Sequence, residues 1–314
     1  MVNPQPIRFV VVGDVTLDVT VRGPATATPG ADRPAHITLA PGGQGANLAV
    51  RLARRGAGVD LVTALADDLP GQQMRYALAV DGVTLVPLPA ARSGIVVSLV
   101  DGAGERAMLS DRVSFDAEAL ASPAVHAALD SASWIHISGY PLADSRSGGA
   151  LAGLVASRRA GQVCSVGGGS FAGGNGLLSR LRLTRPDLVL VDRSEASAIL
   201  AAGSVAGRLR TAEELAAGLV SALGGVAVVT DGAEGSAAAI GAQTLTMPST
   251  PGVAVDATGA GDAHAAGFLL AVAEGPWPPS SATLHDALEQ GGRLGAEVAG
   301  VVGAQARVPS EESQ

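Results

Sequence analysis

Residues 256–262 read Asp-Ala-Thr-Gly-Ala-Gly-Asp, and they lie between a short apolar run at 253–255 and a segment with apolar residues at helical spacing. This pattern predicts a strand over 253–255, a tight turn of small residues and then a helix. The buried stripe of that helix is predicted to be Ala265, Phe268, Leu269 and Val272. A turn of this kind leaves the first helical N–H groups and the positive end of the helix dipole facing outward, which is an arrangement that binds anions.

Asp262 falls in the first turn of the predicted helix. There the dipole favours its ionised form, and the carboxylate can take a proton from a hydroxyl group held beside the anion site. Asp262 equally fits a structural role in which it caps the helix and the glycines only permit close packing. The turn by itself leaves both interpretations open.

Outward from this turn, strand-length apolar runs alternate with helical patterns. The runs are 9–12, 59–65, 134–137, 162–166, 188–191 and 226–230, and the helical patterns are 46–55, 145–159, 194–200 and 211–223. Such alternation predicts an α/β fold with three layers, in which a doubly wound, mainly parallel sheet lies between helices. Residues 15–40 and 93–112 instead read as short alternating strands, and they predict a small β lid. We therefore expect one domain over 1–309 that carries this lid, followed by a frayed tail at 310–314.

Composition excludes several classes of protein. The chain has 314 residues, its 21 basic residues are all arginine, and its formal net charge is −8. Without lysine there is no Walker-type phosphate loop, no protein-kinase lysine and no Schiff base. Scattered arginines in an acidic chain argue against a nucleic-acid partner. No apolar run reaches the roughly 18 residues of a membrane span, and the start lacks a secretory signal, so we expect a cytoplasmic protein without a membrane partner.

Two groups of residues suit a polyol. The turn Gly42-Gly43-Gln44-Gly45-Ala46-Asn47 precedes a predicted helix, and Asp14 and Asp18 follow the first strand. Glycines let the backbone approach a ligand closely, Asn47 adds an amide, and carboxylates at the carboxyl end of a parallel strand lie where open α/β sheets bind ligands. The turn lacks the spacing of a dinucleotide fingerprint, which disfavours an NAD-dependent oxidoreductase. Each group also fits an ordinary capped or solvated turn.

Later carboxylates and glycines suit a nucleotide. Asp192 and Glu195 open a helix after the strand at 188–191, where they can hold Mg²⁺ or form a capping box. Thr230, Gly232 and Gly235 lie between two strands, where they can wrap phosphates or simply make a hairpin. Arg106, on the predicted lid, can reach a substrate or a phosphate group when the lid closes, or can be a solvated surface residue.

In their order along the chain, these motifs resemble those of the ribokinase-like (PfkB) family of carbohydrate and nucleoside kinases. The most specific is the box at 256–262, which is similar to the family signature D-T-x-G-A-G-D, with Ala257 at the position of the threonine. Asp192 stands where the family's N-x-x-E motif has asparagine. Ser138-Gly139-Tyr140 occupies the place where ribokinases carry a glutamate toward the sugar. The identity of the sugar is therefore left open.

The resemblance implies a role for each residue. Asp262 would be the base, and the amides of Gly259, Ala260 and Gly261 the anion hole. Sugar-binding residues would be Asp14, Asp18, Gly42, Gly43 and Asn47, with Arg106 from the lid. The ATP site would be lined by Asp192, Glu195, Thr230, Gly232 and Gly235. Glu195 would organise Mg²⁺ through water, and Asp256 would lie beside a monovalent-cation (K⁺) site that the segment at 303–304 completes.

The function that this resemblance implies is ATP-dependent phosphorylation of a primary hydroxyl group of a small carbohydrate, by an enzyme that forms a homodimer through its lid. Two alternatives remain. One is a nucleoside kinase of the same family, and the other is a non-catalytic relative that only binds sugar or nucleotide.

Overall fold

The computed structural model describes residues 7–23, 30, 32–101, 106–169, 176–201 and 211–312. Its main sheet has nine strands, and the order in which they lie side by side confirms the predicted α/β class. That order is β13 (Gln243–Met247), β12 (Ser236–Ile240), β11 (Val226–Thr230), β10 (Leu188–Asp192), β9 (Val163–Gly167), β8 (Trp134–Ile137), β1 (Arg8–Val12), β4 (Gly58–Ala64) and β5 (Thr84–Leu88). Strand β12 pairs antiparallel with both β11 and β13, and the other neighbouring strands of this sheet pair parallel. The sheet is therefore mainly parallel, as the alternating pattern predicts.

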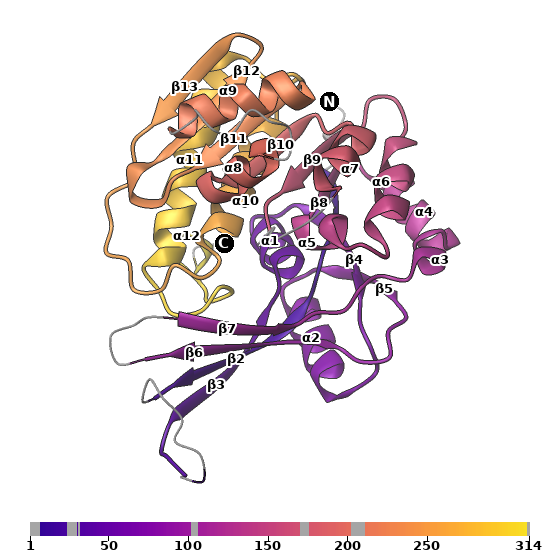
Figure 1. Cartoon of the computed structure of the whole chain (residues 1–314), viewed down its shortest axis with the longest axis vertical. Coiled ribbons are helices and arrows are strands. Elements are labelled where there is room, and N and C mark those ends of the chain that lie inside the picture. Colours follow the sequence, from indigo (N-terminus) through magenta and orange to yellow (C-terminus); the bar gives the residue numbers. More distant parts are fainter. Residues whose placement is uncertain are drawn as a thin grey trace.

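Helices cover both faces of this sheet (Figure 1). One layer contains α1 (Gln44–Ala53), α2 (Leu69–Val80), α10 (Ala260–Ala273) and α11 (Ser281–Ala299). The other contains α4 (Pro123–Ser131), α6 (Gly148–Ala156), α7 (Leu177–Thr184), α8 (Arg193–Ala201) and α9 (Ala212–Leu223). Strand β1 shows why the run at 9–12 is apolar throughout: Phe9 and Val11 face the first layer, while Val10 and Val12 face the second.

The strand order places a ligand crevice beside β1. From β1 the chain passes to β4 and β5 on one side and then returns to β8 on the other. Ligands of open α/β sheets bind at such a reversal, outside the carboxyl ends of the strands. Asp14 follows β1 and Ser138 follows β8, so both residues lie at that edge.

A second sheet forms the lid and projects from the main body (Figure 1). Its four strands lie in the order β3 (His36–Gly42), β2 (Thr16–Arg22), β6 (Gly94–Val100) and β7 (Arg106–Asp111). In its register Thr16 lies opposite both Gly42 and Gly94, so the lid joins the main body at the start of β2, the end of β3 and the start of β6. Every helix in the described part of the chain is too short or too polar to span a membrane.

The strand expected at 253–255 does not form. Val253 is 82 % exposed and Val255 is 57 % exposed. The N–H groups of Val255 and Asp256 both donate to the carbonyl oxygen of Ala299, at the end of α11, at 2.7 and 3.0 Å. The segment is thus tied to a helix end and has no strand partner, although its β-branched residues are typical of a strand.

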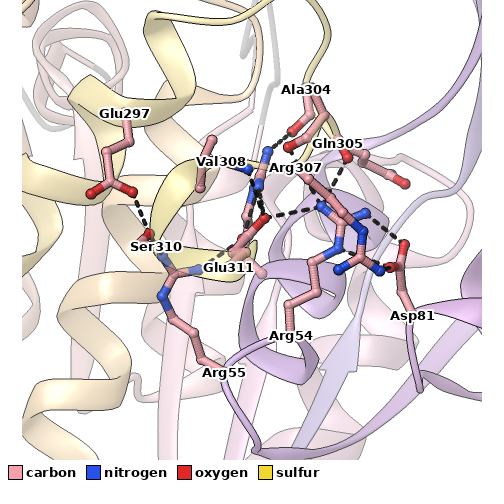
Figure 2. Close-up of polar contacts among 12 residues, drawn as sticks. Arg54, Arg55, Asp81, Glu297, Ala304, Gln305, Arg307, Val308, Ser310 and Glu311 are labelled. Carbon is pink, nitrogen blue, oxygen red and sulfur yellow. Dashed lines mark hydrogen bonds and ion pairs between the residues drawn. The ribbon is translucent and has the colours of Figure 1, made fainter. Parts of the chain in front are cut away.

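A frayed tail was expected over 310–314, but residues 309–312 form the short helix α12 (Pro309–Glu312), and residues 313–314 lie outside the described residues. Its Glu311 has a side chain with 0 % exposure. Three arginines at the end of α1 surround that carboxylate. Arg51 lies at 2.7 Å. Arg55 lies at 2.8 Å and Arg54 at 3.2 Å (Figure 2). This polar segment is buried because the three arginines compensate the charge of the Glu311 carboxylate.

These four residues, Arg51, Arg54, Arg55 and Glu311, are called the arginine clasp below. Burial raises the pKa of Glu311, but the hydrogen bonds and charges of Arg51, Arg55 and Arg54 together outweigh that effect and hold the pKa below its ordinary value. Removing one partner from a buried ion pair leaves the other charge without compensation, which costs about 3–5 kcal/mol.

A chain that ends at Pro309 is therefore expected to lose about 3–5 kcal/mol in free energy of unfolding, because Arg51 is left buried without a carboxylate partner. A chain that ends at Glu312 keeps the clasp and is the control. Urea denaturation of both proteins measures the difference. Equal midpoints for the two truncated chains would show that the clasp contributes nothing to stability.

Candidate active site

The turn at 256–262 opens α10, whose N-cap is Gly259. Gly259 has φ +78°, a left-handed conformation that favours glycine, and an added Cβ atom would lie 2.7 Å from the Cβ atom of Ala304. A Cβ atom at Gly261 would meet nothing within 4 Å, so the backbone there faces open space. The first amides of α10 are therefore held from behind by Ala304 and are open in front, which is the geometry of an anion site.

Asp256 joins this turn to the end of the chain. One carboxylate oxygen accepts hydrogen bonds from the N–H group (3.0 Å) and the hydroxyl group (2.6 Å) of Thr258, and the other accepts from the N–H group of Gly303 (3.1 Å). The segment at 303–304 thus lies beside Asp256.

Asp262 lies in the first turn of α10 and is bonded to the glycine-rich turn. The side-chain amide of Asn47, on α1, donates to its carboxylate at 2.8 Å. Burial raises the pKa of Asp262 to about 7; Asn47 and the charge of Arg112 oppose this shift, while Asp14 and Glu195 reinforce it. Burial and the neighbouring negative charges thus oppose the ionised form that we expected the helix dipole to favour.

The two early carboxylates lie beside the same turn. An oxygen of Asp14 accepts a long hydrogen bond (3.5 Å) from the N–H group of Gly45. Asp18 accepts one from the hydroxyl group of Thr16 at 2.7 Å, and an added Cβ atom at Gly42 would collide with its carboxylate. Burial raises the pKa of Asp18. Gly43 is the N-cap of α1. The predicted sugar-side residues therefore lie together where the lid joins the main sheet.

Arg112, just beyond β7, is the positive group of this region, and sequence reasoning missed it. Its guanidinium group forms an ion pair with Asp14 and lies 3.7 Å from the centre of the Tyr140 ring. Sequence reasoning chose Arg106, at the opposite end of β7, and the side chain of Arg106 is outside the described residues. Its place in the chain could have identified Arg112, because it directly follows the strand through which the lid returns to the main body.

The predicted nucleotide-side residues line a cleft on the other side of Gly261. Its lining includes Thr230, Gly232, Gly235, Ala260 and Gly261, together with Gly292, Gly295 and Ala296 of α11. An adjoining cavity is lined by Gln44, Gly168, Asp192, Glu195, Thr230, Gly261 and Asp262. Because Thr230 and Gly261 line both hollows, the cleft leads to the carboxylate of Asp262.

Asp192 and Glu195 form a capping box and face that cavity as well. The N–H group of Asp192 donates to Glu195, and the N–H group of Glu195 donates to Asp192, each at 2.8 Å. The second oxygen of Glu195 accepts from the N–H group of Gly169 at 2.6 Å. Burial raises the pKa of Glu195 to about 7, and the charge of Asp192 adds to that rise. A capping box and a role in holding Mg²⁺ are therefore compatible for these two residues.

Gln305 is a second residue that sequence reasoning missed. Its side-chain amide donates to the amide oxygen of Asn47 at 3.0 Å. Asn47 therefore has its oxygen bonded to Gln305 and its nitrogen bonded to Asp262, which fixes the orientation of the amide. Residues 258 positions apart meet here, and no local pattern indicates such a pair.

Comparisons with known proteins agree with this arrangement. Residues 7–311 match the pfkB family carbohydrate kinases. A fructokinase from Klebsiella pneumoniae is 29 % identical over 320 residues, covering 96 % of each chain. Ribokinase from Arabidopsis thaliana, solved with ribose and ATP, superposes with a TM-score of 0.80 at 20 % identity, covering 98 % of this chain and 97 % of that one. Ribokinase from Cryptococcus neoformans, solved with ADP, gives 0.74 at 22 % identity, covering 98 % of both.

The fold is that of an α/β protein with a β lid and with a cavity at the start of α10. The chain belongs to the pfkB family of carbohydrate kinases. Both the predicted family and the predicted ribokinase-like fold are confirmed.

The raised pKa of Asp262 has a consequence for stability. Between its ordinary value of 3.8 and about 7, the folded protein holds a proton that the unfolded chain lacks, so stability falls as pH rises through this window. Asp262→Asn carries no charge, so its melting temperature should exceed that of the wild type at pH 8 by more than it does at pH 4.5. Differential scanning fluorimetry measures both, with Asp286→Asn, whose side chain is 71 % exposed, as the control. An equal difference at both pH values would contradict the buried, proton-binding state of Asp262.

Proposed function

We propose that this protein transfers the γ-phosphoryl group of ATP to a primary hydroxyl group of a small carbohydrate. The observation that carries the proposal is the 2.8 Å hydrogen bond from Asn47 to Asp262. It joins the turn suited to a polyol to the helix start suited to an anion, as an in-line transfer between the two ligands requires. The similar proteins include a fructokinase and ribokinases, and these names support a sugar as the acceptor.

In this proposal Asp262 accepts the proton of the attacking hydroxyl group. A carboxylate with a pKa of about 7 is ionised in half of the molecules at neutral pH and is a stronger base than an ordinary aspartate. The amides of Gly259, Ala260 and Gly261 stabilise the negative charge on the transferred group. Asp14, Asp18, Gly42, Gly43 and Asn47 hold the sugar. Thr230, Gly232 and Gly235 hold ATP, whose binding is supported by relatives solved with ATP or ADP.

The donor set fits a magnesium ion. Asp192 and Glu195 line the cavity next to Asp262. Among the described residues, no three His, Cys, Asp or Glu side chains form a closed cage for a metal ion. Mg²⁺ typically keeps several waters and uses one or two carboxylates beside substrate phosphates. Glu195 would hold the ion through water, and the ion would supply positive charge to the phosphates of ATP. For K⁺, Asp256 and Gly303 remain the proposed neighbours.

A coupled assay of ADP release tests the function over pentoses, hexoses, keto-sugar acids and nucleosides, each with and without K⁺. We expect turnover with a sugar and an acidic limb in the pH profile near pH 7, because protonated Asp262 cannot act as base.

Asp262→Asn should lower kcat by about 10²–10⁴-fold while the sugar still binds. Preference for a nucleoside would favour the nucleoside-kinase alternative. Absence of turnover with every acceptor, with ATP still bound, would leave the non-catalytic alternative.

The lid sheet supports the proposed homodimer. Ile37 pairs with Val21, which pairs with Leu99, and Leu39 pairs with Val19 in the next row. Alternate residues of a strand share a face, so these side chains lie on one face of the sheet. Val97 pairs with Val19 and with Leu109, which places Leu109 on the same face. Exposure on that face is 59 % for Ile37, 56 % for Leu39, 43 % for Leu99 and 64 % for Leu109. An exposed apolar face of this kind marks an interaction surface.

Leu39→Glu should therefore shift the protein from dimer to monomer, because a charge placed in the apolar interface stays unpaired. Light scattering coupled to size-exclusion chromatography measures the mass. Met108→Glu is the control: Met108 is 57 % exposed and neighbours Leu109 on β7, so it points to the other face. A dimer that persists in Leu39→Glu would place the interface elsewhere.

A further inference from the structure

We propose that Glu311 is a positioning residue of this enzyme. Through the arginine clasp, it holds the segment at 303–305 against the anion-binding turn and against the partner of the catalytic base. The proposal rests on the proposed function, and it concerns residues far from the ligands themselves.

The first connection runs to the anion site through Arg51. One terminal nitrogen of Arg51 donates to both oxygens of Glu311, at 2.8 and 2.7 Å. The other donates to the carbonyl oxygen of Ala304 at 2.6 Å. Ala304 in turn lies directly behind Gly259, where it fills the space that a side chain would need. The guanidinium group thus fixes the backbone on which the anion-binding turn rests.

The second connection runs to the base through Arg54. Its Nη1 atom contacts Glu311 at 3.2 Å and donates to the carbonyl oxygen of Gln305 at 2.9 Å (Figure 2). Gln305 then donates to Asn47, and Asn47 donates to Asp262. Two arginines at the end of α1 therefore hold two successive carbonyl groups, and each carbonyl belongs to a residue that supports the site.

Glu311 is the group that keeps these guanidinium groups in place. The side chains of Arg51 and Glu311 have 0 % exposure, so neither charge can be compensated by water. A neutral residue at 311 leaves a buried positive charge, which becomes hydrated only if the side chain or the segment around it moves. Either movement breaks the bond between Arg51 and Ala304. Loss of the Glu311 carboxylate should therefore disturb Gly259, which rests on Ala304, and Asn47, which is bonded to Gln305.

The groups facing Asp262 determine how its titration would respond. Asn47 of α1 and the charge of Arg112 lower its pKa, whereas burial, Asp14 and Glu195 raise it. If the hydrogen bond from Asn47 weakens, one of the contributions that lower the pKa of Asp262 is reduced. The acidic limb of kcat should then move to higher pH.

Glu311→Gln tests the proposal against a matched control, Asp60→Asn. Asp60 is also a buried carboxylate with 4 % exposure, and it pairs with Arg8 at the start of β1, at the opposite end of the strand from Asp14. Both substitutions should lower the melting temperature. Only Glu311→Gln should lower kcat, by about tenfold or more, and move the acidic limb up by about half a pH unit to one unit, the equivalent of one hydrogen bond. Glu311→Asp, which keeps the charge, should recover part of the loss.

Gln305→Ala separates positioning from general stability. It cuts the bond to Asn47 without disturbing the ion pairs, so it should reproduce the shift of the acidic limb with little change in melting temperature. In the double variant Gln305→Ala, Glu311→Gln, the two shifts should not add, because both act through Asn47. Fully additive shifts, or no shift in either single variant, would overturn the proposal.

Hydrogen–deuterium exchange provides a readout that does not depend on catalysis. Amides of residues 256–264 should exchange faster in Glu311→Gln than in Asp60→Asn, compared at equal distance below each melting temperature. Equal exchange in the two variants would overturn the positioning role. If the wild type phosphorylates no acceptor, the proposed function fails, and this comparison still decides whether the clasp holds the turn.

Discussion

The hydrogen bond between Asn47 and Asp262 is the contact on which the site depends. It joins the first half of α1 to the first turn of α10, two helices of the same layer that are far apart in the chain. The amide of Asn47 has one correct orientation, because its oxygen is bonded to Gln305 and its nitrogen to a carboxylate. A rotated amide would place its oxygen against the carboxylate of Asp262. The position of Asp262 is thus set by the glycine-rich turn and by the segment around Gln305 together.

The same edge of the sheet concentrates negative charge. The charges of Asp14 and Glu195 act on Asp262, and that of Asp14 acts on Asp18; burial raises the pKa of Asp18, Glu195 and Asp262. Arg112 provides the opposing charge from the side of the lid. For a phosphoryl group, such surroundings are unfavourable unless backbone amides and a metal ion supply the positive potential. The absence of lysine from the chain is consistent with that solution, since neither contribution needs a lysine side chain.

Sequence reasoning predicted the layers and the family because both depend on local patterns. Alternating apolar runs specify strands and helices, and a glycine-rich turn before a helix is legible without its partners. It failed where partners are distant. Arg112 and Asp14 are 98 positions apart. The tail at 310–314 looked like solvated polar sequence, because the arginines that bury Glu311 are about 260 positions earlier. The run at 253–255 has the composition of a strand, but β-branched residues cannot form one without a neighbouring strand.

The buried arginines are best explained by what they hold. A buried ion pair gains little net stability over apolar residues of the same volume, because both charges lose their water. Arginine nevertheless has several donors in one rigid plane, so a single side chain can bind a carboxylate and a carbonyl group at the same time. Arg51 does so with Glu311 and Ala304, and Arg54 does so with Asp81 and Gln305. An apolar core at this place would bury the end of the chain equally well. It would leave the carbonyl groups of residues 304 and 305 without these donors, and the support behind Gly259 and Asn47 would then have no fixed position.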